Sequence, residues 1–138
     1  GFGTAGESFW IGLQNLNALT SYPNEQQSLR IVLDISSGRL RRKVVYYGKF
    51  HVGSKNKQYN LTIGEYDHKE GKNYDALSGH NGHVFTVKKS TPGKQEKDCK
   101  LGILTGGWWF KHCNSANLNG RKRGFWKRQD PGIFWIID

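Results

Sequence analysis

Residues 44–66 read VVYYGKFHVGSKNKQYNLTIGEY, and this stretch decides the fold. Residues 44–52 are rich in β-branched and aromatic side chains, which favour extended backbone. Residues 59–66 alternate apolar side chains with polar or small ones, which is the period of a strand with one buried face. Gly53 and Ser54 interrupt the pattern between them. Such a short connection favours antiparallel pairing, so the stretch predicts two neighbouring strands of an antiparallel sheet.

The residues on the N-terminal side add a third strand and a helix. Residues 29–35 alternate in the same way, and the turn-forming residues 36–38 separate them from the strand that follows. Residues 8–20 predict a helix, with Ser8 as its N-cap. Its apolar residues recur three and four positions apart, so they share one face, and they are Phe9, Leu13, Leu16 and Leu19.

The second half of the chain has no comparable periodicity. The 138 residues suit a single domain with its own core. Within it, residues 1–66 predict a helix and sheet core, and residues 67–138 predict a loop-rich subdomain with a return segment. We therefore expect an α+β fold with its ligand site among the loops, where binding residues usually lie. No run approaches about 18 apolar residues, so no membrane insertion is expected.

The chain carries 21 Lys and Arg against 11 Asp and Glu, a formal net charge of +10. Such an excess attracts polyanions. The densest basic stretch is residues 121–128, where two aromatic side chains lie among five cationic ones. It is a candidate polyanion site, and a plain solvated surface is the alternative. Its candidate ligand-binding residues are Arg121, Lys122, Arg123, Trp126, Lys127 and Arg128, and a second basic cluster comprises Arg39, Arg41, Arg42 and Lys43.

No catalytic or metal-binding motif stands out in the sequence. Residues 1–6 spell GxGxxG, but no strand precedes them, as a dinucleotide site requires. The five His show neither HExxH spacing nor a zinc-type arrangement with Cys, and neither GxSxG nor paired carboxylates occur. We therefore expect no enzyme, no metal site and no cofactor. Asn60 begins the acceptor pattern Asn60-Leu61-Thr62 and is a candidate glycosylation site.

Two adjacent tryptophans form either a shelf for a ligand or a part of the core. Trp108 and Trp109 follow a pair of glycines. Neighbouring side chains on extended backbone point in opposite directions, so we expect one indole to be buried and the other to be partly open. Both are candidate ligand-binding residues, together with His112 and Asn114 shortly after them.

A set of short motifs runs in order through nearly the whole chain. The motifs are GFG at 1–3, ESFWIGL at 7–13, LRI at 29–31, YYGKFHVG at 46–53, YNLTIGEY at 59–66, HNG at 80–82, GGWWF at 106–110, SANLNG at 115–120 and GIFW at 132–135. In this order they resemble the fibrinogen-related domain, which is the C-terminal globular domain of fibrinogen. No single motif is decisive, but the ordered set is very specific.

This resemblance implies a twisted antiparallel sheet flanked by helices and joined to a loop-rich subdomain that holds the ligand pocket. It also implies a secreted, non-enzymatic module that recognises glycans, acetylated sugars or protein receptors. Cys99 and Cys113 match the family's cysteine pair, so a disulfide is expected between them, closing a loop with a separation of 14 residues. The His112–Cys113 peptide bond is expected to be cis, as it often is at this place in the family.

The chain departs from the family pattern in ways that change the expected ligand. The family continues at both ends, so we expect a partial domain with sheet edges left to be covered. Where the family has an acidic calcium loop, residues 88–93 read KKSTPG, and lysines there would repel the ion, so no calcium is expected. Leu104, Asn114 and Gln129 stand where acetyl-binding members have a Tyr, a His and a further aromatic residue, so acetyl recognition is not expected.

Two functions remain open. The first is a secreted, calcium-independent recognition module of the lectin or innate-defence type, which binds glycans or surface polyanions and prefers polyanions. The alternative is a receptor-ligand or extracellular-matrix module of the angiopoietin or tenascin type, which binds a protein receptor or a glycosaminoglycan. A nucleic-acid-binding domain would also suit the charge, but the cysteine pair and the motifs argue against it. Oligomers that raise avidity are expected to form through regions outside this chain.

Overall fold

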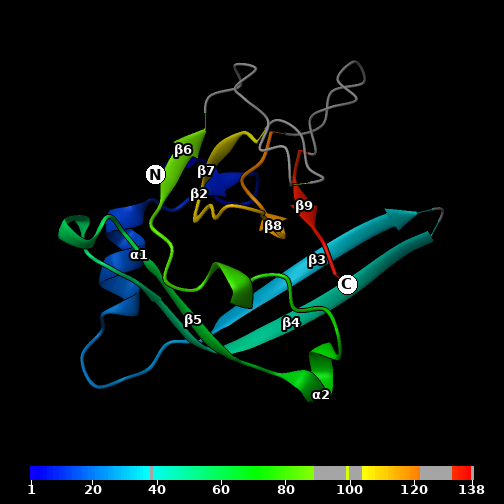
Figure 1. Ribbon diagram of the computed structural model, residues 1–138, viewed down its shortest axis with the longest axis horizontal. Coiled ribbons are helices and arrows are strands. Elements are labelled where there is room, and N and C mark those ends of the chain that lie inside the picture. The colour runs from blue at the N-terminus through cyan, green and yellow to red at the C-terminus, as the bar shows by residue number, and fades with distance from the viewer. Residues whose placement is uncertain (38, 89–98, 100–103, 122–131, 138) are drawn as a thin grey trace.

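The centre of the molecule is a three-stranded antiparallel sheet in the order β3-β4-β5 (Figure 1). β3 (Leu29–Ser37) pairs with β4 (Arg39–Val52) along its whole length and forms a long hairpin with it. β5 (Leu61–Tyr66) lies on the other side of β4. This arrangement confirms the antiparallel sheet predicted from the alternating pattern. The computed structural model describes residues 1–37, 39–88, 99, 104–121 and 132–137.

β4 begins earlier than the sequence predicted. The predicted strand started at residue 44, because the preceding run of Arg and Lys is not typical of a strand. In the structure Arg39 is paired with Ser37 and Lys43 with Leu33, so the partner strand extends β4 through the basic run. The basic cluster at 39–43 therefore lies on paired sheet backbone and not in a loop.

The N-terminal helix is shorter than predicted. α1 (Leu13–Thr20) is preceded by β2 (Phe9–Trp10), which pairs with β1 (Phe2–Gly3). Ser8 is therefore not the N-cap. Gly12 occupies that position with a φ of 94°, which is a conformation open to glycine and disfavoured for other residues. A helix cannot continue through such a residue, so α1 cannot extend back to residue 8.

α1 docks on the C-terminal end of β4. The backbone N–H of Val52 donates to the Oγ1 of Thr20 at 2.9 Å, and the Nδ2 of Asn17 donates to the carbonyl oxygen of Val52 at 2.9 Å. Two of the four residues predicted for the apolar face of the helix pack against the core. The other two, Phe9 and Leu19, are exposed.

The rest of the described chain consists of short elements. Two pairs of short antiparallel strands, β6 with β7 and β8 with β9, join separate segments of the second half. Among the described residues, no helix has the length and apolar character needed to cross a membrane. The elements are η1 (Lys55–Lys57), α2 (His68–Gly71), η2 (Ser78–His80), β6 (Thr86–Lys88), β7 (Gly106–Trp108), β8 (Ala116–Asn117) and β9 (Phe134–Trp135).

One hydrophobic core is shared by the sheet and the loop-rich half. Burial of apolar surface on both sides therefore holds the two halves of the chain together. From the sheet the core takes Val45, Tyr47, Val52 and Leu61, which are 0% exposed, and from the second half it takes Trp108, Trp109 and Phe110.

A cluster of hydrogen bonds joins β4 to η2. The hydroxyl group of Tyr47 donates to the Oδ1 of Asp75 at 2.7 Å, and the same oxygen accepts from the backbone N–H groups of Leu77 and Ser78. Burial, followed by the bond to Asp75, raises the pKa of Tyr47, so the phenol keeps its proton. Burial also opposes ionisation of Asp75, but the hydrogen bonds from Ser78, Tyr47 and Leu77 outweigh it and lower the pKa of this carboxyl group. The ionised carboxylate therefore fixes η2 against the sheet.

Candidate functional site

His80 links η2 to the segment that follows β7. It is 0% exposed, and its Nδ1 lies 2.8 Å from the carbonyl oxygen of Trp109. Its Nε2 accepts from the backbone N–H groups of Ser115 and Ala116, at 3.2 and 3.3 Å. These partners require a proton on Nδ1 and none on Nε2, which is a neutral imidazole. Burial lowers the pKa of His80, because it disfavours the charged imidazolium. The hydrogen bond to the carbonyl oxygen of Trp109 acts in the opposite direction, but its effect on the pKa is smaller. Both ring nitrogens are thus engaged in holding the fold.

Both tryptophans of the GGWWF motif belong to the core. Trp108 is 5% exposed and Trp109 is 3% exposed, so the prediction that one indole is partly open is wrong. The rule of opposite directions applies inside a strand, and β7 ends at Trp108, so the two rings lie together with their centroids 5.1 Å apart. The Nε1 of Trp109 donates to the carbonyl oxygen of Tyr59 at 2.8 Å, and its ring meets the edge of Phe85. Neither indole offers a free face to a ligand.

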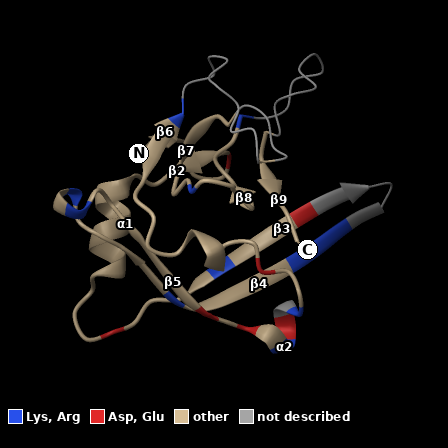
Figure 2. Cartoon of the chain, in the orientation of Figure 1, with Lys and Arg blue, Asp and Glu red and all other residues tan. Residues whose placement is uncertain are grey.

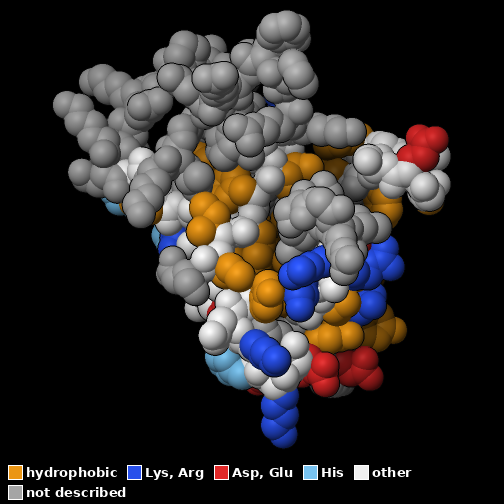
Figure 3. All heavy atoms as spheres, turned by 90° about the vertical axis from the view of Figure 1, so that its right-hand side faces the viewer, with side chains coloured by type: hydrophobic (Ala, Val, Ile, Leu, Met, Phe, Trp, Pro, Cys, Tyr) orange, Lys and Arg blue, Asp and Glu red, His pale blue; other side chains and the backbone are white. Residues whose placement is uncertain are grey.

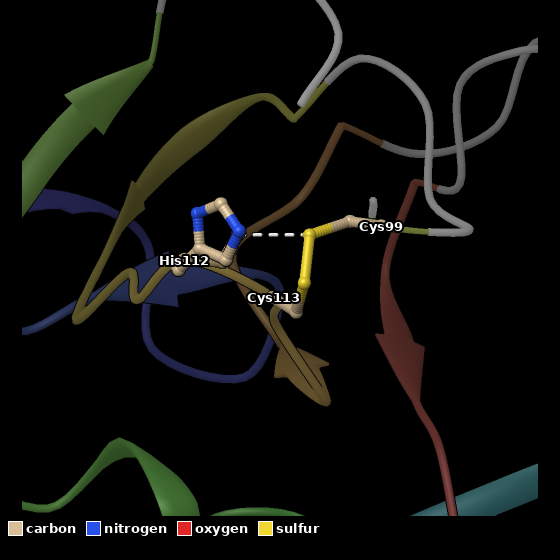
Figure 4. A group of neighbouring side chains, drawn as sticks. All are labelled: Cys99, His112 and Cys113. Carbon is tan, nitrogen blue, oxygen red and sulfur yellow. Dashed lines mark hydrogen bonds between the residues drawn. A yellow bond between two sulfur atoms is a disulfide. The ribbon is translucent and has the colours of Figure 1, made fainter. Parts of the chain in front are cut away.

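The cysteines and a neighbouring histidine form one cluster, in which His112 and Cys113 are exposed and Cys99 is half-buried (Figure 4). Cys99 and Cys113 are joined by the predicted disulfide, with their Cα atoms 5.4 Å apart. His112 lies beside them, and the potential ligand atoms of the three residues are within 4.8 Å of one another. Both sulfur atoms are in the disulfide, however, and a metal would need thiolates. The His112–Cys113 bond is trans, so the prediction of a cis bond is wrong, and trans is the form favoured by about 2.5–4 kcal/mol for a non-proline residue.

Asn114 closes a turn and does not face a ligand. Its Oδ1 accepts from the backbone N–H of Lys111 at 2.8 Å, and its Nδ2 donates to the carbonyl oxygen of the same residue at 3.0 Å. The side chain is buried, and both its oxygen and its nitrogen form hydrogen bonds within its own loop. Leu104 stands where acetyl-binding members were expected to have a Tyr. It is half-buried and packs against the core. Of the candidates near the second cysteine, only His112 is exposed.

The structure describes only the beginning of the basic stretch at 121–128. Arg121 is exposed, and its backbone N–H donates to the Oγ1 of Thr105 at 2.7 Å. The stretch as a whole therefore stays a prediction, and so does the expected absence of a calcium site, because residues 89–98 are not described. The predicted residues that lie outside the described part are Lys122, Arg123, Trp126, Lys127, Arg128 and Gln129.

Asn60, the candidate glycosylation site, lies in the bend before β5. Its backbone is bonded on both sides, to Gly53 at 2.8 Å and to Lys57 at 3.3 Å. The residue is half-buried, and its Oδ1 has no hydrogen-bond partner among the described residues. Attachment of a glycan to this side chain stays a prediction.

Two surface grooves bring together residues that the sequence did not link. Only one of these grooves was indicated by the sequence, through the basic cluster at 39–43. That cluster contributes to one wall of its groove, and the opposite wall comes from residues 70–74, which the sequence did not connect with it. One groove has a volume of about 490 Å³ and lies between β3 and β9, lined by Val32, Leu33, Asp34, Tyr74, Leu118, Ile133, Phe134, Trp135 and Ile137. The other has a volume of about 460 Å³ and lies beside β4 and α2, lined by Arg42, Lys43, Val44, Tyr46, Glu70, Lys72 and Tyr74.

Comparison with known proteins relates this chain to one family. Residues 1–137 match the family of the fibrinogen beta and gamma chains, C-terminal globular domain. Tenascin-R of chicken (Gallus gallus) is 33% identical over 135 residues, which cover 98% of this chain and 9% of tenascin-R. Human ficolin-3 is 34% identical over 121 residues, which cover 88% of this chain and 38% of ficolin-3.

A solved structure supports the same assignment. The fibrinogen-like globe domain of human ANGPTL6 superposes with a TM-score of 0.73 at 27% identity, covering 97% of this chain and 58% of that one. The chain thus spans well under two thirds of each of these relatives. The likeness confirms the α+β fibrinogen-type fold expected from the motifs. The chain belongs to the family of the fibrinogen C-terminal globular domain.

Proposed function

We propose that this chain is a calcium-independent, extracellular recognition module that binds glycans or surface polyanions. The observation that carries the proposal is a formal net charge of +10 on a fold whose relatives are recognition modules and not enzymes. Surface Lys and Arg concentrate anionic ligands by long-range attraction and then pair with their acidic groups. An extracellular location accords with the disulfide, since such bonds persist in oxidising compartments.

Two polar side chains inside the fold, the buried His80 and the half-buried Asp75, have structural roles and are not free for acid–base chemistry. His80 uses both ring nitrogens to hold backbone groups of distant segments. Asp75 accepts from the phenol of Tyr47 and from two backbone N–H groups. General acid–base catalysis needs a group with a free proton site within reach of a substrate, and both of these groups are occupied inside the fold.

The test is a glycan array that carries sulfated, other acidic and neutral saccharides, read at low and at physiological salt. We expect discrete signals for individual acidic saccharides that weaken as salt rises, because the ions screen exposed charges. Signals for neutral acetylated sugars alone, or for no saccharide and no polyanion, would contradict the proposal.

A second candidate function is binding to a protein receptor or a matrix component. The likeness to tenascin-R along nearly the whole chain, and to the globe domain of human ANGPTL6, favours it. The same array separates the two functions. Signals that come only from long sulfated polymers, with no discrete saccharide among them, would favour the receptor or matrix module.

Added calcium is expected to leave the melting temperature unchanged. Lysines occupy the place of the family's acidic calcium loop, and the first of them, Lys88, holds its Nζ 5.7 Å from the centroid of the Phe110 ring. Only a ligand that binds the native state raises Tm, so a chain without a calcium site should not respond. The measurement is thermal unfolding with millimolar calcium, and magnesium at equal ionic strength is the control. A rise that calcium causes, magnesium does not, and a chelator reverses would overturn this prediction.

A further inference from the structure

The groove beside β4 lies where the sheet loses its third strand. β5 is paired with β4 only from Tyr66 opposite Tyr47 onward. Next along, the backbone N–H of Asp67 donates to the carbonyl oxygen of Tyr46, and the chain then leaves the sheet to form α2. The part of β4 before Tyr46 is therefore bordered on this side by α2 and the residues after it (Figure 1). The volume of the groove, about 460 Å³, falls in the usual range for small-molecule sites.

The lining of this groove is cationic. Arg42, Lys43 and Lys72 contribute three positive charges, and Glu70 contributes one negative charge. Arg42 is bonded to Asp34 at 2.8 Å, and this is the one ion pair among the residues that the structure describes. Both side chains of that pair are largely exposed, so the pair is open to exchange with another anion. Lys43 and Lys72 form no ion pair among the described residues, so no carboxylate there neutralises their charges.

Charged residues of both signs border the groove. Figure 2 shows basic residues along the outer part of β4, with acidic residues on β3 and α2 at its borders. The space-filling view of the same side shows Lys and Arg side chains gathered next to hydrophobic surface (Figure 3). The groove thus combines positive potential with apolar walls, and a low-dielectric wall strengthens the field at such a site.

The two tyrosines of the groove contact neighbouring residues. The hydroxyl group of Tyr46 accepts from the Nε of Arg30 at 3.3 Å. The carbonyl oxygen of Tyr74 accepts from the Nε1 of Trp135 at 2.7 Å, and the Nζ of Lys43 lies 5.1 Å from the centroid of the Tyr74 ring. Tyrosine rings give a large, amphipathic surface, and with only two side-chain torsions each they lose little conformational entropy when a ligand packs on them.

These features select one ligand chemistry. The cations suit sulfate groups, the carboxylate of Glu70 can accept from hydroxyl groups, and the tyrosine rings can pack against the C–H surface of a sugar. We infer that the groove formed by Arg42, Lys43, Lys72, Tyr46 and Tyr74 binds a sulfated saccharide unit of an acidic polysaccharide. This inference rests on the proposed function and gives it a site apart from residues 121–128. An acidic peptide would use the cations but would offer fewer hydroxyl groups to Glu70 and less C–H surface to the rings.

The test measures binding of a heparin tetrasaccharide by isothermal titration calorimetry. The variant Lys43→Gln with Lys72→Asn removes two unpaired cations and leaves the Arg42–Asp34 pair intact. Asn suits position 72, because φ is 44° and ψ is −120° there, and Asn is among the residues favoured at turn positions with such a positive φ. The matched control, Lys55→Gln with Lys57→Gln, removes the same charge from η1, at the opposite end of the molecule (Figure 1). Unchanged circular dichroism and Tm establish that each variant is folded.

We expect the groove variant to bind the tetrasaccharide at least about tenfold more weakly than the parent, since loss of charged hydrogen bonds worth about 1.4 kcal/mol lowers affinity tenfold. The control should stay within about twofold. Equal binding by the groove variant and the parent would overturn the inference, and so would equal binding of the desulfated tetrasaccharide by the parent.

The outcomes also separate this inference from the proposed function. If the parent binds no glycan or polyanion at all, the proposed function fails. If the parent binds, the groove variant binds equally, and neutralisation of Arg121, Lys122, Arg123, Lys127 and Arg128 removes binding, the proposed function stands and the groove assignment is wrong.

Discussion

Replacement of Trp109 with alanine is expected to destabilise the protein by about 3–5 kcal/mol, the usual range for deletion of a buried aromatic side chain. The ring is 3% exposed, packs on the edge of Phe85 and donates its indole N–H to the carbonyl oxygen of Tyr59. Alanine would leave a cavity and, in addition, an unpaired buried carbonyl group. The measurement is the free energy of unfolding in urea, followed by far-UV circular dichroism.

Two further variants divide this effect into its parts. Trp109→Phe keeps an aromatic ring and removes the N–H donor, so a smaller loss of about 1–3 kcal/mol is expected. Leu19→Ala serves as the surface control, because Leu19 is 55% exposed, and it should change stability by about 0.5 kcal/mol or less. If Trp109→Ala costs no more than this control, the assignment of the tryptophan pair to the core is wrong.

Stability is expected to fall as the pH drops below about 6.5, because of His80. Burial lowers the pKa of this residue in the folded state, so between the folded and unfolded pKa values the unfolded chain binds more protons. Stability therefore rises with pH across that window and is lost on acidification. Protonation of Nε2 would also place a donor against the N–H groups of Ser115 and Ala116. The measurement compares urea midpoints at about pH 5.5 and about pH 7.5, above the range in which Asp75 titrates.

The variant His80→Gln tests the assignment. It is expected to be less stable than the parent at the higher pH, by about 2–4 kcal/mol, because glutamine cannot satisfy the three backbone groups with the same geometry. Its stability should depend less on pH than that of the parent. His112→Gln is the control, because His112 is exposed whereas His80 is fully buried. A parent with equal stability at both pH values would contradict the role given to His80.

The strands could be predicted from the sequence because their signal is local. Alternation at 29–35 and 59–66 indicates which side of each strand faces the core. In the structure each of these strands is paired with β4 in an antiparallel sheet, as predicted. The extra length of β4 could not be predicted, because pairing with β3 overrides the weak strand preference of Arg and Lys. The predicted start of α1 was also wrong. The apolar spacing from residue 9 onward suggested a continuous helix, although the conformation of Gly12 interrupts it.

Candidate site residues were harder to predict, because their roles depend on contacts between distant segments. The motif around Trp108 and Trp109 belongs to the ordered set that identified the family, yet no local rule shows that both rings are covered. Asn114 was a candidate ligand-binding residue, but its side chain forms hydrogen bonds within its own turn. The groove beside β4 combines Lys43 with Lys72 and Tyr74, which follow it by about 30 residues, and only the path of the chain through α2 brings them together.

The hydrogen bonds of two tryptophans also impose an order on folding. Trp109 is bonded to Tyr59 across 50 residues, and Trp135 is bonded to Tyr74 across 61 residues. The β3–β4 hairpin, in contrast, pairs residues that are close in sequence and can form early. During synthesis the sheet must therefore wait, with the surface that receives the tryptophans still uncovered, until both have left the ribosome. Apolar surface that is exposed in this way favours aggregation, so we expect the nascent chain to be vulnerable during that interval.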